Sequence, residues 1–173
     1  VLARTARLYD LTVFPPIRDK DAHDMPDGFA RVLVKASCPV LLSAEKPLAT
    51  LGRRIAVCWD DGVACARALV ASVPFLEKAD KVALVTVRDS EMPEPGMDEA
   101  LSYLALHGVR AEKHTILRGG RKVAAALLES AAAGGYDMLV TGGYGRGRLT
   151  EAVFGGVTEH VVSHASLPVF LVH

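Results

Sequence analysis

The sequence lacks an excess of charge, long apolar runs and paired cysteines. It has 20 Lys+Arg against 20 Asp+Glu, so no overall field attracts a polyanion or an anionic membrane. No apolar run approaches the roughly 18 residues that cross a bilayer, and Val1–Arg7 lacks the pattern of a secretory signal. The three cysteines show no C-x-x-C spacing, which is typical of reduced thiols. We therefore expect a cytoplasmic protein whose partners are neither nucleic acid nor membrane.

From Leu51 onward, short apolar runs alternate with helical-period segments, a pattern that predicts βαβ units and a parallel sheet. The run Arg54–Trp59 is almost continuously apolar, as a central strand buried on both faces should be. Arg110–Leu117 alternates polar and apolar residues and is expected at an edge. The other expected strands are Lys81–Val87, Asp137–Thr141 and Val169–Val172, and the expected helices are Val63–Pro74, Met97–His107, Arg121–Ala133 and Val157–Ala165.

The first fifty residues echo the end of the chain. Tyr9–Val13 resembles Tyr136–Val140, and Cys38–Leu42 resembles Leu167–Leu171. Such a match indicates an internal repeat, although two short apolar runs can also coincide by chance. Residues 1–50 are thus predicted to be a strand–helix–strand remnant of another copy, beside one domain in residues 51–173. The remnant is too small to fold alone and should dock on a neighbour, with a strand in Leu8–Val13.

A glycine-rich segment, Thr141–Thr158, lies between an expected strand and an expected helix. Glycines let backbone N–H groups approach a phosphate, and the following helix adds free amides and its positive dipole end. Arg146 could add charge, although loop arginines are usually solvated. The segment lacks the Lys-Ser/Thr ending of a Walker loop and does not follow the first strand, so it is neither familiar phosphate loop.

Gly142, two residues, Gly145, nine residues and Gly155 give the spacing G-2x-G-9x-G. This spacing resembles the nucleotide motif of the universal stress protein family, and the resemblance covers Leu51–His173. It implies a doubly wound α/β fold of the adenine nucleotide alpha hydrolase-like type, with a mainly parallel five-stranded sheet in the order 3-2-1-4-5. The implied ligand is ATP or another adenine nucleotide such as AMP, with or without Mg²⁺.

The resemblance also implies two groups of binding residues. Asp60, with Cys58 and Trp59 before it, and the backbone at Val87 would hold the adenosine. The positions that would hold phosphate are Gly142, Gly143, Gly145, Arg146, Gly155, Gly156, Val157 and Thr158. Asp60 has a second interpretation as the cap of the following helix.

One position departs from the family pattern. Gly156 stands where the family has Ser or Thr, which removes a hydroxyl donor worth about 1 kcal/mol. Thr158 lies roughly 200° further around a helix and does not replace that hydroxyl. The departure leaves open whether nucleotide binds. In the first copy, a Pro-Pro sequence at Pro15 replaces the glycine loop, so that copy should not bind nucleotide.

No catalytic or metal site is expected. The sequence has no Gly-x-Ser-x-Gly elbow, and Cys58 falls inside a strand where it should pack. His160 and His164 are four residues apart, but metal sites need further ligands.

Two main functions remain open. The first is a stress-response protein that binds an adenine nucleotide and acts by occupancy and association, and the second is an interaction domain without nucleotide. A weak ATPase is a third option. The apolar final strand, Val169–Val172, needs a partner for its open edge. Val40–Leu42 or a second chain should pair with it, giving a pseudo-dimer or a homodimer.

Overall fold

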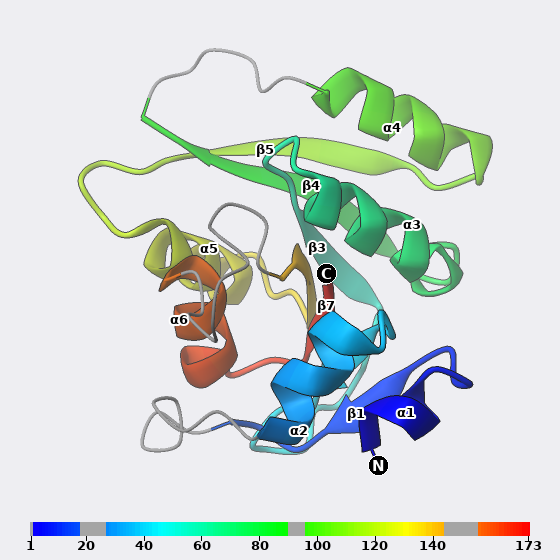
Figure 1. The fold of residues 1–173 in the computed structure, drawn as a ribbon. Helices are drawn as coiled ribbons and strands as arrows, with labels where there is room; N and C mark the ends of the chain where they lie inside the picture. Colours follow the sequence, from blue (N-terminus) through cyan, green and yellow to red (C-terminus); the bar gives the residue numbers. More distant parts are fainter. Residues whose placement is uncertain (1, 18–26, 90–95, 144–155) are drawn as a thin grey trace.

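One twisted sheet crosses the molecule in the computed structural model, which describes residues 2–17, 27–89, 96–143 and 156–173 (Figure 1). Its seven strands lie in the order β1-β2-β7-β6-β3-β4-β5. All neighbouring strands are parallel except β2 and β7, which are antiparallel. The strands are β1 (Thr12–Phe14), β2 (Val40–Leu42), β3 (Arg54–Cys58), β4 (Lys81–Arg88), β5 (Ala111–Leu117), β6 (Met138–Gly142) and β7 (Val169–Val172).

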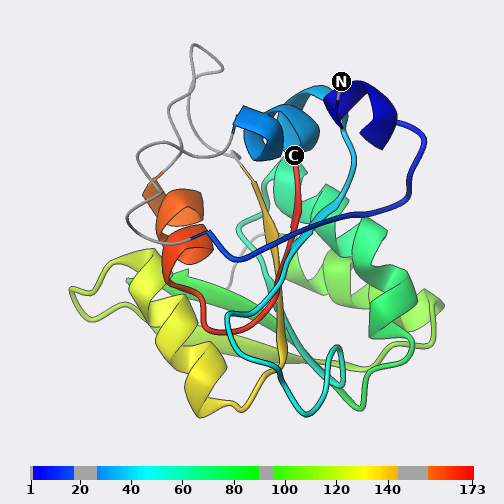
Figure 2. The ribbon, with the colours of Figure 1, turned by 90° about the horizontal axis from the view of Figure 1, so that it is seen from below.

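Helices cover both faces of this sheet. Figures 1 and 2 show α3 (Val63–Leu76) and α4 (Met97–Leu106) on one face, and α5 (Val123–Ala133) and α6 (Gly156–His164) on the other. The strands in the middle of the sheet are buried on both faces, so their apolar side chains pack in two separate hydrophobic cores, one on each face. No helix in the described part of the chain is long and apolar enough to cross a membrane.

The strands after residue 51 confirm the expected order. Numbered along the chain from β3, they lie as 3-2-1-4-5, with β3 in the centre and β5 at the edge. β5 is mostly exposed, as its alternating sequence predicts. The five strands expected after residue 51 are all present, and β1 and β2 of the N-terminal segment extend the sheet beyond β7.

The N-terminal fifty residues form the remaining edge. β1 and β2 pair in parallel, and β2 pairs with β7 through Val40 opposite Leu171 and Leu42 opposite Val169. Between them, α2 (Asp27–Ala30) continues into a π-helical turn, η2 (Arg31–Lys35), whose Leu33 is fully buried. The prediction that Val40–Leu42 pairs with the final strand is thus confirmed within one chain. The division into two domains stays a prediction.

Several element boundaries were predicted wrongly, and two of them have a physical reason in the structure. β1 begins at Thr12 instead of Leu8, because the short helix α1 (Leu2–Ala6) ends in an exposed turn that takes up Leu8 and Tyr9. α3 does not stop at Pro74 but continues to Leu76. Pro74 lies on the exposed side of α3, and Leu76 is buried, so packing of the last turn outweighs the lost backbone hydrogen bond.

Candidate functional site

The turn from β3 to α3 carries two carboxylates with different local roles. Asp60 Oδ1 accepts a hydrogen bond from the Gly62 N–H at 2.9 Å. Gly62 is the N-cap residue of α3, and no side chain caps the helix. The interpretation of Asp60 as the N-cap residue is wrong, because Gly62 holds that position, while the Asp60 carboxylate closes the turn before the helix and interacts with the Cys65 thiol in its first turn. Asp61 adopts φ 59°, the left-handed conformation that Asp tolerates better than most residues.

The residues expected around an adenosine divide between the two faces of the sheet. Cys58 and Val87 belong to the core on the side of α5 and α6. Trp59 belongs to the core on the side of α3 and α4. Alternation along an extended backbone explains this, because Cys58 and Trp59 are consecutive and point in opposite directions. The structure therefore places Trp59 apart from Cys58 and Val87.

The cysteines near this turn are buried thiols. Burial, and to a smaller degree the neighbouring Cys65 and Asp60, raise the pKa of the Cys58 thiol far above its ordinary value. Burial and then the hydrogen bond and charge of Asp60 raise the pKa of Cys65 to about 12. Both side chains stay protonated near neutral pH, and the interpretation of Cys58 as a packing residue agrees with this burial.

Gly142, the first motif glycine, lies at the end of β6 directly against the first turn of α3. A Cβ atom there would lie 2.6 Å from the Ala64 carbonyl carbon and 2.6 Å from the Cys65 nitrogen. The close approach of a helix to the strand thus requires glycine at this position, whatever binds nearby.

Gly143 is enclosed by parts of the chain that the sequence did not connect with it. Its N–H donates to the Val172 carbonyl at 2.7 Å, and its own carbonyl lies 3.1 Å from His173 Nδ1. A Cβ atom would lie 3.0 Å from Cδ2 of Leu33, in the N-terminal segment. Sequence reasoning missed Leu33 and His173, and the repeat was the only signal that the N-terminal segment would pack near the glycine segment.

The N-terminus of α6 is more open. A Cβ atom at Gly156 would meet no atom of the described residues within 4 Å, and Val157 is exposed. Thr158 is buried and faces the protein. The expected site residues Gly145, Arg146 and Gly155 lie outside the described residues.

Asp60 and Gly142 lie at the carboxyl ends of β3 and β6, where the direction of chain winding reverses. β3 and β6 are parallel neighbours, yet the helices that follow them cover opposite faces. Ligands of open α/β sheets bind at the carboxyl edge at such a point. The Cys65 thiol interacts with both the Asp60 carboxylate and the Gly142 backbone. Cys65 therefore lies between the turn after β3 and the end of β6.

The histidines on α6 do not form a metal site in the described structure. The rings of His160 and His164 stack with centroids 4.0 Å apart. Among residues 2–17, 27–89, 96–143 and 156–173, no three His, Cys, Asp or Glu side chains lie close enough together to hold an ion.

This sheet order and winding define an α/β protein with the adenine nucleotide alpha hydrolase-like fold. The model of the Universal stress protein family matches residues 52–173, and the chain belongs to this family. No curated protein matches the chain.

Solved structures share the fold at low sequence identity. A universal stress protein from Archaeoglobus fulgidus has a TM-score of 0.75 at 15% identity, and the match covers 98% of this chain and 63% of that one. A functionally unknown protein from Pseudomonas aeruginosa has a TM-score of 0.66 at 19% identity, and the match covers 99% of this chain and 66% of that one. A protein of the universal stress protein family from Burkholderia pseudomallei has a TM-score of 0.53 at 20% identity, and the match covers 72% of this chain and 98% of that one. The chain therefore spans about two thirds of the longer structures it resembles.

Proposed function

We propose that this stress-response protein binds an adenine nucleotide at the carboxyl edge of the sheet, between β3 and β6, and acts by occupancy and association. The family and the fold support this proposal. The observation that carries it is the meeting of Asp60 and Gly142 around Cys65 at the reversal of chain winding.

The described residues fit the two ends of such a ligand. Asp60 and the backbone at Val87, at the ends of neighbouring parallel strands, would hold the adenosine. The first amides of α6, at Gly156 and Val157, would bind phosphate together with the glycines of the loop, because free amides and the helix dipole both favour an anion. Cys58 and Val87 lie on the α6 side of the sheet, so an adenosine bound there and a phosphate bound at the start of α6 would share one face of the sheet.

A second candidate function is an interaction domain without nucleotide. Gly142 and Gly143 favour it, since close packing against α3 and Leu33 already explains why neither position carries a side chain. Glycines that packing requires would persist even if phosphate binding were lost. The two candidate functions therefore predict different effects of substitutions at Gly156, where the described surroundings leave room for a side chain.

Gly156→Asp and its control Gly156→Ala separate the two candidates. An Asp in the first turn of α6 is compatible with the helix and its dipole, but it repels a phosphate. Each protein is purified and denatured, and the supernatant is analysed for ATP, ADP and AMP. We expect nucleotide from the wild type and Gly156→Ala and little from Gly156→Asp. Empty supernatants from all three, with no stabilisation by millimolar ATP after stripping, would favour the interaction domain.

A further inference from the structure

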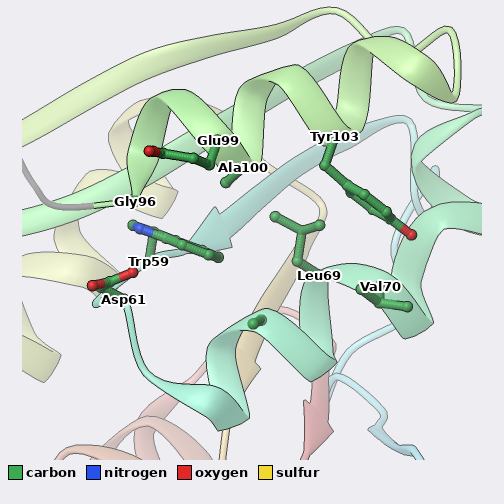
Figure 3. A pocket seen from close by; sticks show the side chains of 9 residues that line it. Trp59, Asp61, Leu69, Val70, Gly96, Glu99, Ala100 and Tyr103 are labelled. Carbon is green, nitrogen blue, oxygen red and sulfur yellow. The ribbon is translucent and has the colours of Figure 1, made fainter.

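A hollow of about 560 Å³ opens between α3 and α4, on the face of the sheet away from Cys58 and Val87. Figure 3 shows the Trp59 ring at one end and Tyr103 at the other, with Leu69 between them. The described lining is mainly apolar and holds two carboxylates, Asp61 and Glu99, and no basic side chain. The hollow is thus an aromatic and aliphatic trough with an acidic end.

The acidic end is formed by two separate elements. Asp61 lies in the turn after β3, and its carboxylate lies against Gly96, the N-cap residue of α4. Glu99 belongs to the first turn of α4. In Figure 3 the Asp61 carboxylate lies beside the Trp59 ring, and the Glu99 carboxylate lies on the first turn of α4 at the same end of the hollow, away from Tyr103.

Neither carboxylate has a cationic partner among the described residues. Other acidic side chains nearby are paired: Asp98 with Lys113, and Asp89 with Arg118. Asp61 and Glu99 form no ion pair of this kind within the described ranges, and the hollow supplies no lysine or arginine. The charge there is therefore available to a ligand.

We propose that this hollow binds a small amphiphilic amine, with its ammonium group between Asp61, Glu99 and the Trp59 ring. A Trp face attracts a cation more strongly than other aromatic rings do, and the attraction grows as the cation loses water. The apolar part of the amine lies along Leu69 and Ala100 towards Tyr103. An anion is disfavoured by both carboxylates, and a neutral apolar molecule gains nothing from them.

Glu99 also has a structural role that the test must separate from binding. Acidic residues in the first turn stabilise a helix through its dipole, so a change at Glu99 affects α4 itself. Asp61 gives the cleaner variant. Asn has nearly the same shape and tolerates the left-handed conformation of this residue, so Asp61→Asn removes the charge and keeps the turn.

The chain contains a single tryptophan, Trp59, so its fluorescence reports directly on the hollow. The full chain is titrated at pH 7 with hexylamine, and with hexanol and hexanoate as neutral and anionic molecules of the same length. We expect saturable binding of hexylamine about tenfold tighter than that of hexanol, and the weakest binding for hexanoate.

Two variants test whether the Asp61 carboxylate contributes to the binding of hexylamine. Asp61→Asn should weaken hexylamine about threefold and leave hexanol unchanged. Asp10→Asn, which neutralises an exposed carboxylate in the N-terminal segment, should change neither. The proposal is overturned if hexylamine and hexanol bind equally, if no saturable fluorescence change occurs, or if Asp61→Asn behaves like Asp10→Asn. None of these outcomes depends on whether the protein binds nucleotide.

Discussion

Gly142 and Cys65 are packed so closely that a Cβ atom at Gly142 would lie 2.6 Å from the Cys65 nitrogen. The neighbouring atoms belong to the backbone of α3, which cannot turn aside as a flexible side chain would. Gly142→Ala should therefore displace the helix and lower the free energy of unfolding by about 2 kcal/mol, as overpacking in a core does. Urea denaturation measures this change.

Gly156→Ala is the matched control, since its Cβ would meet no atom within 4 Å in the part of the chain that the structure describes. Alanine is the better helix former, so this variant should equal or exceed the wild type in stability. Equal stability of the wild type and Gly142→Ala would show that α3 packs less closely on β6 than the structure describes.

Asp137 ties the start of β6 to the segment that enters β3. Its carboxylate accepts hydrogen bonds from Thr50 Oγ1 at 2.6 Å, from the Arg53 N–H at 3.1 Å and from the Arg54 N–H at 2.9 Å. Asp137→Ala leaves these donors without their acceptor and should cost about 2–3 kcal/mol in unfolding free energy. Asp80→Ala, which breaks an exposed ion pair with Arg53, should cost under about 1 kcal/mol in the same assay.

The contribution of Asp137 should depend on pH. Burial alone would raise the pKa of its carboxyl, but the hydrogen bonds from Thr50, Arg54 and Arg53 hold the pKa below its ordinary value. A folded pKa below the unfolded value stabilises the protein above about pH 4, and this contribution is lost as the pH falls through the folded pKa. The stability difference between wild type and Asp137→Ala should therefore narrow as the pH falls below about 4. A stability difference that stays constant with pH would contradict the lowered pKa of Asp137.

Removal of residues 1–50 should change the oligomeric state. In the full chain, β2 pairs with β7 and covers its outer edge. The fragment 51–173 exposes this edge, which is apolar and has unpaired backbone groups. We expect it to form a dimer through β7 at micromolar concentration, with twice the fragment mass by light scattering. A monomeric fragment would show that the edge tolerates exposure.

The alternation of apolar runs and helical segments was enough to predict the strands after residue 51 and, with the family resemblance, their order. The repeat located β2, and the open edge of the final strand indicated that either β2 or a second chain would pair with it. The contacts of Gly143 with Leu33 and of Asp137 with Thr50 were not predictable, because each joins residues far apart in the sequence whose types carry no pairing signal. Trp59 was assigned to the adenosine by its place in the motif, and only the alternation of side chains along the strand places it on the other face.

Gly156→Ser tests the departure from the family pattern. The open space at this position leaves room for the hydroxyl, and a hydrogen bond to phosphate contributes about 1 kcal/mol. If nucleotide binds as proposed, Gly156→Ser should bind ATP about fivefold more tightly than Gly156→Ala, which controls for the change in backbone freedom. Equal ATP affinity of Gly156→Ser and Gly156→Ala would show that the phosphate does not bind at the start of α6.

Calorimetric titration of ATP into the full chain, stripped of any bound nucleotide, tests the proposed function most directly. We expect saturable binding with one site per chain, and loss of that binding in Gly156→Asp while the unfolding transition of this variant remains cooperative. The absence of any heat of binding up to millimolar ATP, in a protein that is folded, would contradict it.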